Sequence, residues 1–173
     1  MRGFYWLIEG VLAGCPRPGG TSRGSVARTF GREEEMAPDA PDSLDEDLDW
    51  LKQQGIGAIL SLTETPLLEE TLARHGLAAL HLPVPDLTPP TPEQLMRALE
   101  FIDAQRALGC GVAVHCLMGQ GRTGAVLAAF LIRDGASPEE ALRTLRALCP
   151  GAVGAEAQER ALHAFAARRD WIL

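Results

Sequence analysis

The amino-acid sequence predicts an α/β fold, in which a single domain is built on a central, mostly parallel sheet flanked by helices. Short apolar runs typical of buried strands alternate along the chain with longer segments in which leucines recur at helical intervals. The chain has 173 residues, which is enough for one domain with a full hydrophobic core. No long internal repeat interrupts this alternation, so we expect one domain over residues 1–173.

The expected strands and helices follow one another in a simple order. Apolar runs predict strands over residues 4–8, 11–13, 56–62, 78–84 and 112–116. Six helices are expected. Three begin with capping residues: residues 43–54 with a capping box of Ser43 and Glu46, the helix that ends at Gly109 with Thr91-Pro92-Glu93-Gln94, and a later one with Ser137-Pro138-Glu139-Glu140. The others run from Thr65-Pro66 to residue 75, after Arg122, and over residues 155–167. The loops at the carboxyl ends of the parallel strands are therefore expected to form the functional site.

Between the second strand and the first helix, residues 16–41 are rich in Gly, Pro, Ser, Arg and Glu, with few large apolar side chains. This composition predicts a flexible surface insertion over about residues 19–42. Its arginines are interpreted as solvated loop charges rather than substrate contacts: Arg17, Arg23, Arg28 and Arg32.

Acidic residues outnumber basic ones by 23 to 16, which gives a formal net charge of −7. This balance disfavours non-specific binding to nucleic acids and to anionic membranes. The longest uninterrupted apolar run, residues 125–132, is too short to span a bilayer. The four cysteines lack metal-binding CxxC spacing and fit reduced thiols. We therefore expect a cytoplasmic monomer without nucleic-acid or membrane partners.

One stretch competes with a cytoplasmic location, because Leu12-Ala13-Gly14-Cys15 resembles the cleavage site of a bacterial lipoprotein. Glu9 interrupts the apolar segment that such a signal requires, and the segment before the cysteine is short. We therefore assign these residues to the fold. Cys15 is also a candidate resolving thiol for a reactive cysteine, whereas Cys110 and Cys149 are expected to be small buried side chains.

The pattern H-C-x-x-G-x-x-R-T begins at His115, where the last expected strand ends. Gly119 and Gly121 allow the backbone to turn with its N–H groups facing inward, and the helix that begins near Arg122 adds its positive dipole end. The Arg122 guanidinium can then hold a tetrahedral oxyanion with two charge-assisted hydrogen bonds. The same field favours the thiolate form of Cys116 as a nucleophile. A plain glycine turn would not need this whole set of residues together.

Other side chains near this loop have candidate roles. Asp86, after the expected strand 78–84, could protonate a leaving oxygen and later activate water, or it could simply cap a turn; spacing alone leaves both open. Thr123 could donate a hydrogen bond to the Cys116 sulfur, satisfy backbone groups at the helix start, or do both. His115 could orient the loop and support the thiolate, or pack in the core.

These residues resemble the signature of the protein tyrosine phosphatase superfamily, and within it the atypical dual-specificity phosphatases of the small VHZ type. The resemblance rests on residues 10–14, 59–64, 84–90, 115–124 and 158–159. It implies the cysteine-dependent phosphatase fold and four roles: Cys116 as nucleophile, Arg122 as phosphate clamp, Asp86 as general acid, and Thr123 as an aid to breakdown of the intermediate.

The resemblance also implies a substrate-binding set, which comprises Leu117, Met118, Gly119, Gln120, Gly121, Arg122 and Gln158. Gln158 matches a glutamine that positions water or substrate in relatives, and Glu64 is a candidate ion-pair partner of Arg122. Phosphate, sulfate or a similar oxyanion is expected in the loop. No metal or other cofactor is implied, because Arg122 and the loop amides supply the positive charge.

The expected function is a metal-independent protein phosphatase that hydrolyses phosphotyrosine, and by extension phosphoserine or phosphothreonine, through a phosphocysteine intermediate. The substrate would be a phosphorylated protein or a small phosphomonoester. A rhodanese-like sulfurtransferase is an alternative, although Asp86 would have no purpose in it. A phosphoinositide phosphatase is another, although Leu117, Met118 and Gln120 carry no charge where a polyanionic headgroup favours lysines. A phosphopeptide-binding module without turnover has no support, because every catalytic position is filled.

Overall fold

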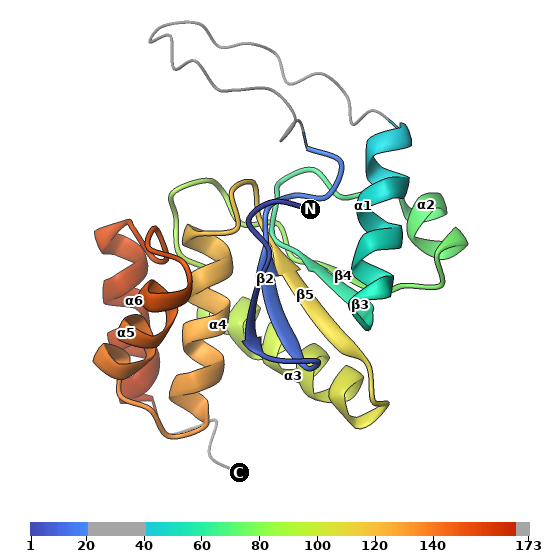
Figure 1. Ribbon diagram of the computed structural model, residues 1–173. Coiled ribbons are helices and arrows are strands. Elements are labelled where there is room, and N and C mark those ends of the chain that lie inside the picture. Colours follow the sequence, from blue (N-terminus) through green and yellow to red (C-terminus); the bar gives the residue numbers. More distant parts are fainter. Residues whose placement is uncertain (21–40, 169–173) are drawn as a thin grey trace, which may run out of the picture.

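The computed structural model describes residues 1–20 and 41–168, which form a five-stranded sheet covered by helices on both faces (Figure 1). The strands are β1 (Tyr5–Ile8), β2 (Leu12–Cys15), β3 (Ile56–Ser61), β4 (Ala78–His81) and β5 (Gly111–His115). Their order is β1-β2-β5-β3-β4, with β1 antiparallel to β2 and the other neighbouring pairs parallel. The predicted α/β fold with a mostly parallel sheet is confirmed.

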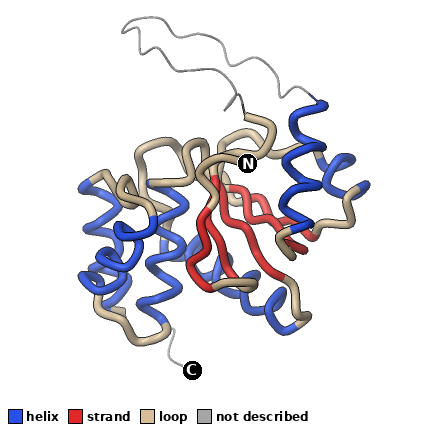
Figure 2. Tube along the Cα trace, in the orientation of Figure 1, coloured by secondary structure: helices blue, strands red, loops and turns tan. Residues whose placement is uncertain are grey.

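The helices form two layers around the sheet, which lies between them in the view by secondary structure (Figure 2). One layer packs into the smaller of two cores and consists of α1 (Pro41–Gln53) and α2 (Glu69–Arg74). The other layer packs into the larger core and consists of α3 (Pro92–Ala107), α4 (Gly121–Arg133), α5 (Pro138–Leu148) and α6 (Glu156–Ala167). Strands β2 and β5 are therefore buried on both faces, whereas the edge strands β1 and β4 are partly exposed.

Strand β5 lies at the centre of the sheet and is completely buried. Val112 and Val114 pack in the larger core, whereas Ala113 between them packs in the smaller one. Alternate side chains of a strand point to opposite faces, so a strand covered on both faces needs a continuous apolar run. This burial fixes the point at which the chain leaves β5 and enters the H-C-x-x-G-x-x-R-T pattern.

Two of the predicted capping boxes are formed as expected. The Thr91 hydroxyl accepts from the Gln94 N–H at the start of α3, and Ser137 accepts from the Glu140 N–H at the start of α5. The third is wrong. Helix α1 begins at Pro41, so Ser43 lies inside it, and its hydroxyl donates to the Gly19 carbonyl (3.2 Å). The Ser43 hydroxyl, which the local pattern assigned to the helix cap, forms a tertiary hydrogen bond instead.

The start of α2 also differs from the prediction, because the helix begins at Glu69 and not at Thr65-Pro66. The Arg17 guanidinium donates hydrogen bonds to the Thr65 carbonyl (2.8 Å) and the Pro66 carbonyl (3.0 Å). These two carbonyls are held by a distant side chain rather than by amides of a following helical turn. The helix therefore starts only after this contact.

The interpretation of Arg17 as a solvated loop charge is likewise wrong, since the residue is only 4% exposed. Its guanidinium also donates to the Thr63 hydroxyl (2.8 Å). Gly19 is buried too, and its N–H donates to the Asp47 carboxylate of α1 (2.9 Å). Most of the predicted insertion, together with Arg23, Arg28 and Arg32, lies outside the described residues.

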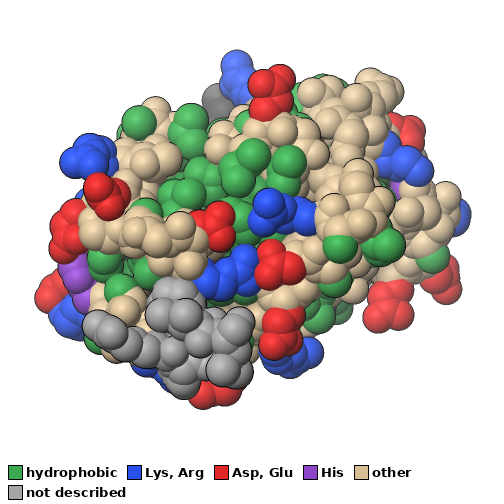
Figure 3. Space-filling view, turned by 90° about the horizontal axis from the view of Figure 1, so that it is seen from below, with side chains coloured by type: hydrophobic (Ala, Val, Ile, Leu, Met, Phe, Trp, Pro, Cys, Tyr) green, Lys and Arg blue, Asp and Glu red, His purple; other side chains and the backbone are tan. Residues whose placement is uncertain are grey.

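The carboxyl ends of the parallel strands lie together at the upper end of the molecule in Figure 1. Figure 3 shows the opposite end, where apolar side chains at the centre are bordered by basic and acidic side chains. Within residues 1–20 and 41–168, no helix is long and apolar enough to cross a membrane.

Candidate active site

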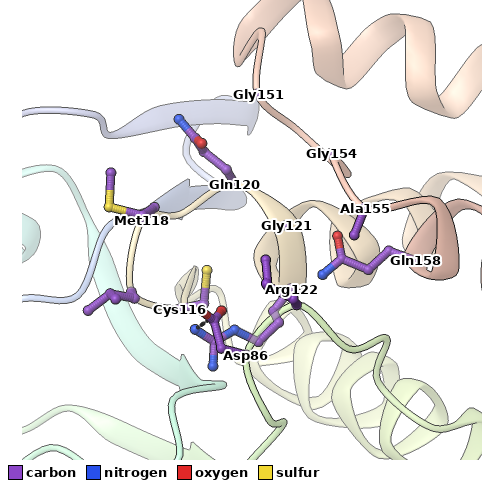
Figure 4. Close-up of a pocket in the computed structure, with 12 residues that line it drawn as sticks. Asp86, Cys116, Met118, Gln120, Gly121, Arg122, Gly151, Gly154, Ala155 and Gln158 are labelled. Atoms are coloured by element: carbon purple, nitrogen blue, oxygen red, sulfur yellow. Dashed lines mark ion pairs between the residues drawn. The ribbon is translucent and has the colours of Figure 1, made fainter. Parts of the chain in front are cut away.

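The site is built where β5 ends and α4 begins. Cys116 follows β5 directly and is 3% exposed, residues 117–120 make the turn, and α4 begins at Gly121. We call residues 116–122 the signature loop. The loop borders a cavity of about 370 Å³ together with the segment around Asp86 and the start of α6 (Figure 4). The predicted nucleophile therefore lies in a hollow at the carboxyl edge of the sheet.

Two glycines let the signature loop pack closely against its surroundings. Gly119 has φ of +71°, and a Cβ there would lie 2.4 Å from the Cys15 carbonyl carbon. A Cβ on Gly121 would lie 2.9 Å from the side-chain amide of Gln158. The left-handed backbone and the close approach of the Cys15 backbone require glycine at position 119, whereas a side chain at position 121 would displace the Gln158 amide.

The N-terminus of α4 faces the cavity without a side-chain cap. Gln120 occupies the N-cap position and makes no capping hydrogen bond, and its side-chain amide instead lies next to Gly151. The first amides of α4 and the positive end of its dipole are thus available to an anion. Thr123, in the same turn, is fully buried, and its hydroxyl has no hydrogen-bond partner among the described residues. The expected Thr123–Cys116 hydrogen bond is therefore not formed here.

The Arg122 side chain connects the signature loop to the segment that carries Asp86. Its guanidinium donates to the Val84 carbonyl (2.9 Å) and forms an ion pair with the Asp86 carboxylate (2.9 Å), drawn in Figure 4. The Arg122 side chain is 5% exposed and that of Asp86 is 61% exposed. Glu64, the partner predicted for Arg122, is exposed, and no ion pair joins the two within the described chain, so that prediction is wrong. The fold thus brings a buried cation and an accessible carboxylate beside Cys116.

His115 lies behind the loop and is fully buried. Its Nε2 is 2.7 Å from the Ser61 hydroxyl, and its Nδ1 is 3.2 Å from the Cys116 carbonyl oxygen. These contacts tie the backbone at the nucleophile to the neighbouring strand β3. The geometry fits the orienting role considered for His115.

The segment after Asp86 is a tight turn with an unusual backbone. Leu87 has φ of +59°, a conformation that costs a leucine about 1–2 kcal/mol. The Thr88 hydroxyl and N–H both donate to the Pro85 carbonyl and close the turn. Gln158 of α6 donates to the Thr88 carbonyl (3.2 Å), while its own side-chain oxygen is buried without a partner among the described residues. Gln158 therefore lines the cavity and supports the turn that carries Asp86.

Cys15 does not share a core with Cys116. Cys15 packs in the smaller core beneath α1, whereas Cys116 belongs to the larger core on the other face of the sheet. Burial raises the pKa of the Cys15 thiol well above its usual range, which makes it a poor nucleophile. This placement disfavours the resolving role. Cys110 and Cys149 are half-buried rather than fully buried, and all four thiols are free.

Sequence reasoning missed two residues that contact the site. The Tyr5 hydroxyl donates to the Gly119 carbonyl (2.9 Å), and the Arg17 N–H donates to the Leu117 carbonyl (3.2 Å). Both belong to the N-terminal segment, which reaches the loop because β2 pairs with β5. No local pattern around Tyr5 or Arg17 signals such a contact, since it depends on strand order.

The predicted substrate-binding residues divide into two groups. The cavity is lined by most of them: Leu117, Met118, Gln120, Gly121, Arg122 and Gln158. Gly119 is instead buried against the Cys15 carbonyl behind the loop. The side chains of Leu117 and Met118 are exposed and lie at the cavity.

Comparison with known proteins gives this geometry a family context. The family model described as a polymorphic toxin system DSP-PTPase phosphatase matches residues 36–136, which include Asp86, Cys116 and Arg122. The dual specificity protein phosphatase 12 of Homo sapiens is 36% identical over 111 residues, covering 60% of this chain and 32% of that protein. The protein tyrosine phosphatase type IVA 3 of Homo sapiens is 29% identical over 108 residues, covering 61% and 62% respectively. The chain spans less than two thirds of the length of these curated relatives.

Solved structures agree with the family match. Tk-PTP in its active form superposes with a TM-score of 0.68 at 34% identity, covering 72% of this chain and 86% of that chain. PTPMT1 superposes with a TM-score of 0.72 at 20% identity, covering 94% and 93%, a likeness that concerns the fold. Because the family model spans more than half of the chain and includes Asp86, Cys116 and Arg122, the chain belongs to the DSP-PTPase family of cysteine-dependent phosphatases.

Proposed function

We propose that the chain hydrolyses phosphomonoesters through a phosphocysteine intermediate. The observation that carries this proposal is the Arg122–Asp86 ion pair beside Cys116 in one cavity at the carboxyl edge of the sheet. A buried guanidinium binds the phosphoryl oxygens, a thiolate attacks phosphorus, and a carboxyl group handles the proton. These three parts are sufficient for ester cleavage without a metal ion.

In the first step the Cys116 sulfur forms a bond to phosphorus, and the bond between phosphorus and the ester oxygen breaks. Asp86 in its acid form donates its proton to that oxygen, so the leaving group departs as an alcohol or phenol. The substrate phosphate replaces the Asp86 carboxylate at Arg122, which frees the accessible carboxyl group to turn toward the ester oxygen. Loop amides and the N-terminus of α4 stabilise the negative charge.

In the second step water attacks phosphorus and the sulfur–phosphorus bond breaks. The Asp86 carboxylate takes a proton from the water, and Cys116 leaves as a thiolate. The Thr123 hydroxyl, buried and without a partner among the described residues, is available to donate to the sulfur as it leaves. Gln158 lines the same cavity, and its side-chain amide is suited to orient the attacking water.

The rim of the cavity favours an apolar organic group on the substrate. Leu87 and Met118 are 73% and 64% exposed and lie at the cavity with Leu117. A leucine at the left-handed position 87 is strained, and its side chain has no packing role in the core that would explain it. An aryl phosphate such as phosphotyrosine fits this rim better than phosphoserine or phosphothreonine, which we expect as secondary substrates.

A phosphoinositide is the second candidate substrate. PTPMT1, which shares this fold, has been crystallised with PI(5)P. Among the described residues, however, Arg122 is the one arginine or lysine that lines the cavity, so a second phosphate would find no cation there. We therefore expect a monophosphate to be preferred over a polyphosphorylated headgroup.

The test follows hydrolysis of an aryl phosphate, a phosphotyrosine peptide, a phosphoserine peptide and PI(5)P by the wild type, with and without chelator. We expect chelator-insensitive activity, highest on the aryl substrates. Cys116→Ser and Arg122→Ala should abolish it, and Asp86→Asn should lower kcat by about 100-fold or more. Arg97→Ala, an exposed arginine of α3, is the matched control and should retain full activity.

Full activity in Cys116→Ser would rule out the phosphocysteine mechanism. Normal activity in Asp86→Asn would remove only the acid assignment. Sulfur transfer from thiosulfate to cyanide, with no ester cleavage, would favour the rhodanese-like alternative. A clear preference for PI(5)P over the aryl substrates would move the substrate to the phosphoinositide class.

A further inference from the structure

The N-terminal segment holds two alternate peptide groups of the signature loop from outside. Tyr5 donates its hydroxyl proton to the Gly119 carbonyl at 2.9 Å. The backbone N–H of Arg17 donates to the Leu117 carbonyl at 3.2 Å. Tyr5 lies on β1 beside β2, and Arg17 follows β2, which pairs with β5 just before the loop.

The direction of these carbonyls determines the direction of the neighbouring amides. In a trans peptide the C=O group and the following N–H point in opposite directions, and the described chain contains no cis peptide bond. A Leu117 carbonyl turned toward Arg17 therefore turns the Met118 N–H the other way. A Gly119 carbonyl turned toward Tyr5 does the same for the Gln120 N–H, and both Met118 and Gln120 line the cavity.

We propose that Tyr5 is a positioning residue, which acts with the Arg17 amide to aim the Met118 and Gln120 N–H groups at a phosphoryl group above Cys116. The inference rests on the proposed function, because it requires that the loop bind an oxyanion. Tyr5 does not touch the substrate. It fixes the orientation of the Met118 and Gln120 N–H groups before an anion binds, so binding requires less ordering of the loop.

The packing position of the Tyr5 ring depends on a glycine in the neighbouring strand. Tyr5 pairs with Gly14 across the β1–β2 hairpin, and a Cβ on Gly14 would lie 2.4 Å from the ring. A glycine at this position lets the ring lie against the strand with its hydroxyl directed at Gly119. The ring and its hydroxyl thus have separable roles, one in packing and one in orienting the loop.

The Tyr5 hydroxyl also stays protonated. Burial raises the pKa of Tyr5 well above its ordinary value, and the neighbouring Cys149, Cys116 and Cys15 add to the shift in their ionised forms. The phenol is therefore a hydrogen-bond donor at any pH at which a phosphatase is assayed. Removing it should change the strength of oxyanion binding without changing the shape of the pH–rate profile.

The experiment uses Tyr5→Phe, which keeps the ring over Gly14 and removes the hydroxyl, with its hydrogen bond to Gly119 and its contact with Cys149. We expect tungstate to bind about fivefold more weakly, which corresponds to one ordinary hydrogen bond. The value of kcat/KM for an aryl phosphate should fall by a similar factor. Gly14→Ala, which displaces the ring and keeps the hydroxyl, should weaken tungstate binding in the same direction.

Ser137→Ala is the matched control, because it also removes one side-chain-to-backbone hydrogen bond, at the start of α5. It should lower the melting temperature and leave tungstate affinity unchanged. Tungstate affinity is measured by titration calorimetry and folding by thermal melting, so a loss of binding can be separated from a loss of stability.

Unchanged tungstate affinity in Tyr5→Phe would overturn the inference and leave the proposed function intact. The inference would also fail if Ser137→Ala weakened tungstate binding as much as Tyr5→Phe did. Failure of the wild type itself to bind tungstate or to cleave an aryl phosphate would overturn the proposed function, and the positioning role with it.

Discussion

Single residues of the signature loop are constrained by what lies behind them as much as by what lies in the cavity. Gly119 combines φ of +71° with a backbone approach that leaves no room for a Cβ. Its carbonyl accepts the Tyr5 hydroxyl, so a shift of this residue also moves the amide that follows. The sequence pattern places a glycine here, but the contact with Cys15 gives the stronger reason for it.

This constraint predicts that Gly119→Ala is far more damaging than a comparable glycine substitution elsewhere. Gly109 has φ of +74°, and a Cβ there would meet nothing within 4 Å, so Gly109→Ala should cost about 1 kcal/mol from backbone strain alone. Gly119→Ala adds a clash with the Cys15 backbone and should cost about 3 kcal/mol of unfolding free energy. It should also lower kcat/KM for an aryl phosphate about 100-fold by misplacing the loop. Urea unfolding and steady-state kinetics measure both, and equal losses in the two variants would contradict this account.

At the scale of secondary-structure elements, Arg17 connects three parts of the fold. Its backbone N–H holds the signature loop, and its guanidinium holds the segment between β3 and α2. The guanidinium satisfies the Thr63 hydroxyl and two carbonyls in a planar arrangement that suits arginine and not lysine. The start of α2 and the position of the signature loop therefore depend on the same residue.

Replacing this side chain should destabilise the fold. Arg17→Ala removes a buried guanidinium and its three hydrogen bonds, and it should lower the free energy of unfolding by about 3 kcal/mol. Arg17→Lys should recover little of this lost free energy, because one ammonium group cannot reproduce the three planar hydrogen bonds of the guanidinium. Arg97→Ala, at an exposed position of α3, should stay within about 0.5 kcal/mol of the wild type. Urea denaturation checks the series, and an Arg17→Ala variant as stable as Arg97→Ala would contradict the assignment.

At the scale of the whole molecule, the buried acids decide how stability depends on pH. Burial raises the pKa of Tyr5, Cys15 and Cys149 in the folded chain. At alkaline pH the unfolded chain therefore loses protons that the folded chain keeps, and stability falls as pH rises above the unfolded thiol pKa of about 8.5. Asp45 and Glu140 affect stability at acidic pH. The His75 and Ser137 hydrogen bonds lower their pKa values, so their contribution is lost as pH falls below about 4.

The melting temperature should therefore be nearly constant between about pH 5 and pH 8 and should decline on both sides, more steeply above pH 9. Thermal melts across this range measure the profile. Cys15→Ala removes one of the buried acids, so its alkaline decline should be shallower than that of the wild type even if the variant is less stable at pH 7. A wild-type melting temperature unchanged from pH 7 to pH 10 would contradict the prediction.

Much of the fold was determined by local sequence. Leucine spacing and capping residues predict α3 and α5 correctly, and the apolar run before His115 predicts the central strand β5. The signature loop was also readable, because Cys116 and Arg122 are joined by a short stretch whose glycines fix its geometry. These features depend on hydrogen bonds and side-chain periodicity within a few residues, so the local pattern suffices.

Only the tertiary structure decided which distant groups meet. The sequence offered Glu64 as the ion-pair partner of Arg122, whereas the fold pairs Arg122 with Asp86, because the same guanidinium holds the Val84 carbonyl and with it the segment that carries Asp86. It assigned Ser43 to a cap and Arg17 to solvent, whereas the fold joins Ser43 to Gly19 and buries Arg17. No sequence pattern around Tyr5 predicted a role at the site. Its contact with Gly119 exists because β1 and β2 lie beside β5, and strand order is set by the packing of the whole chain rather than by neighbouring residues.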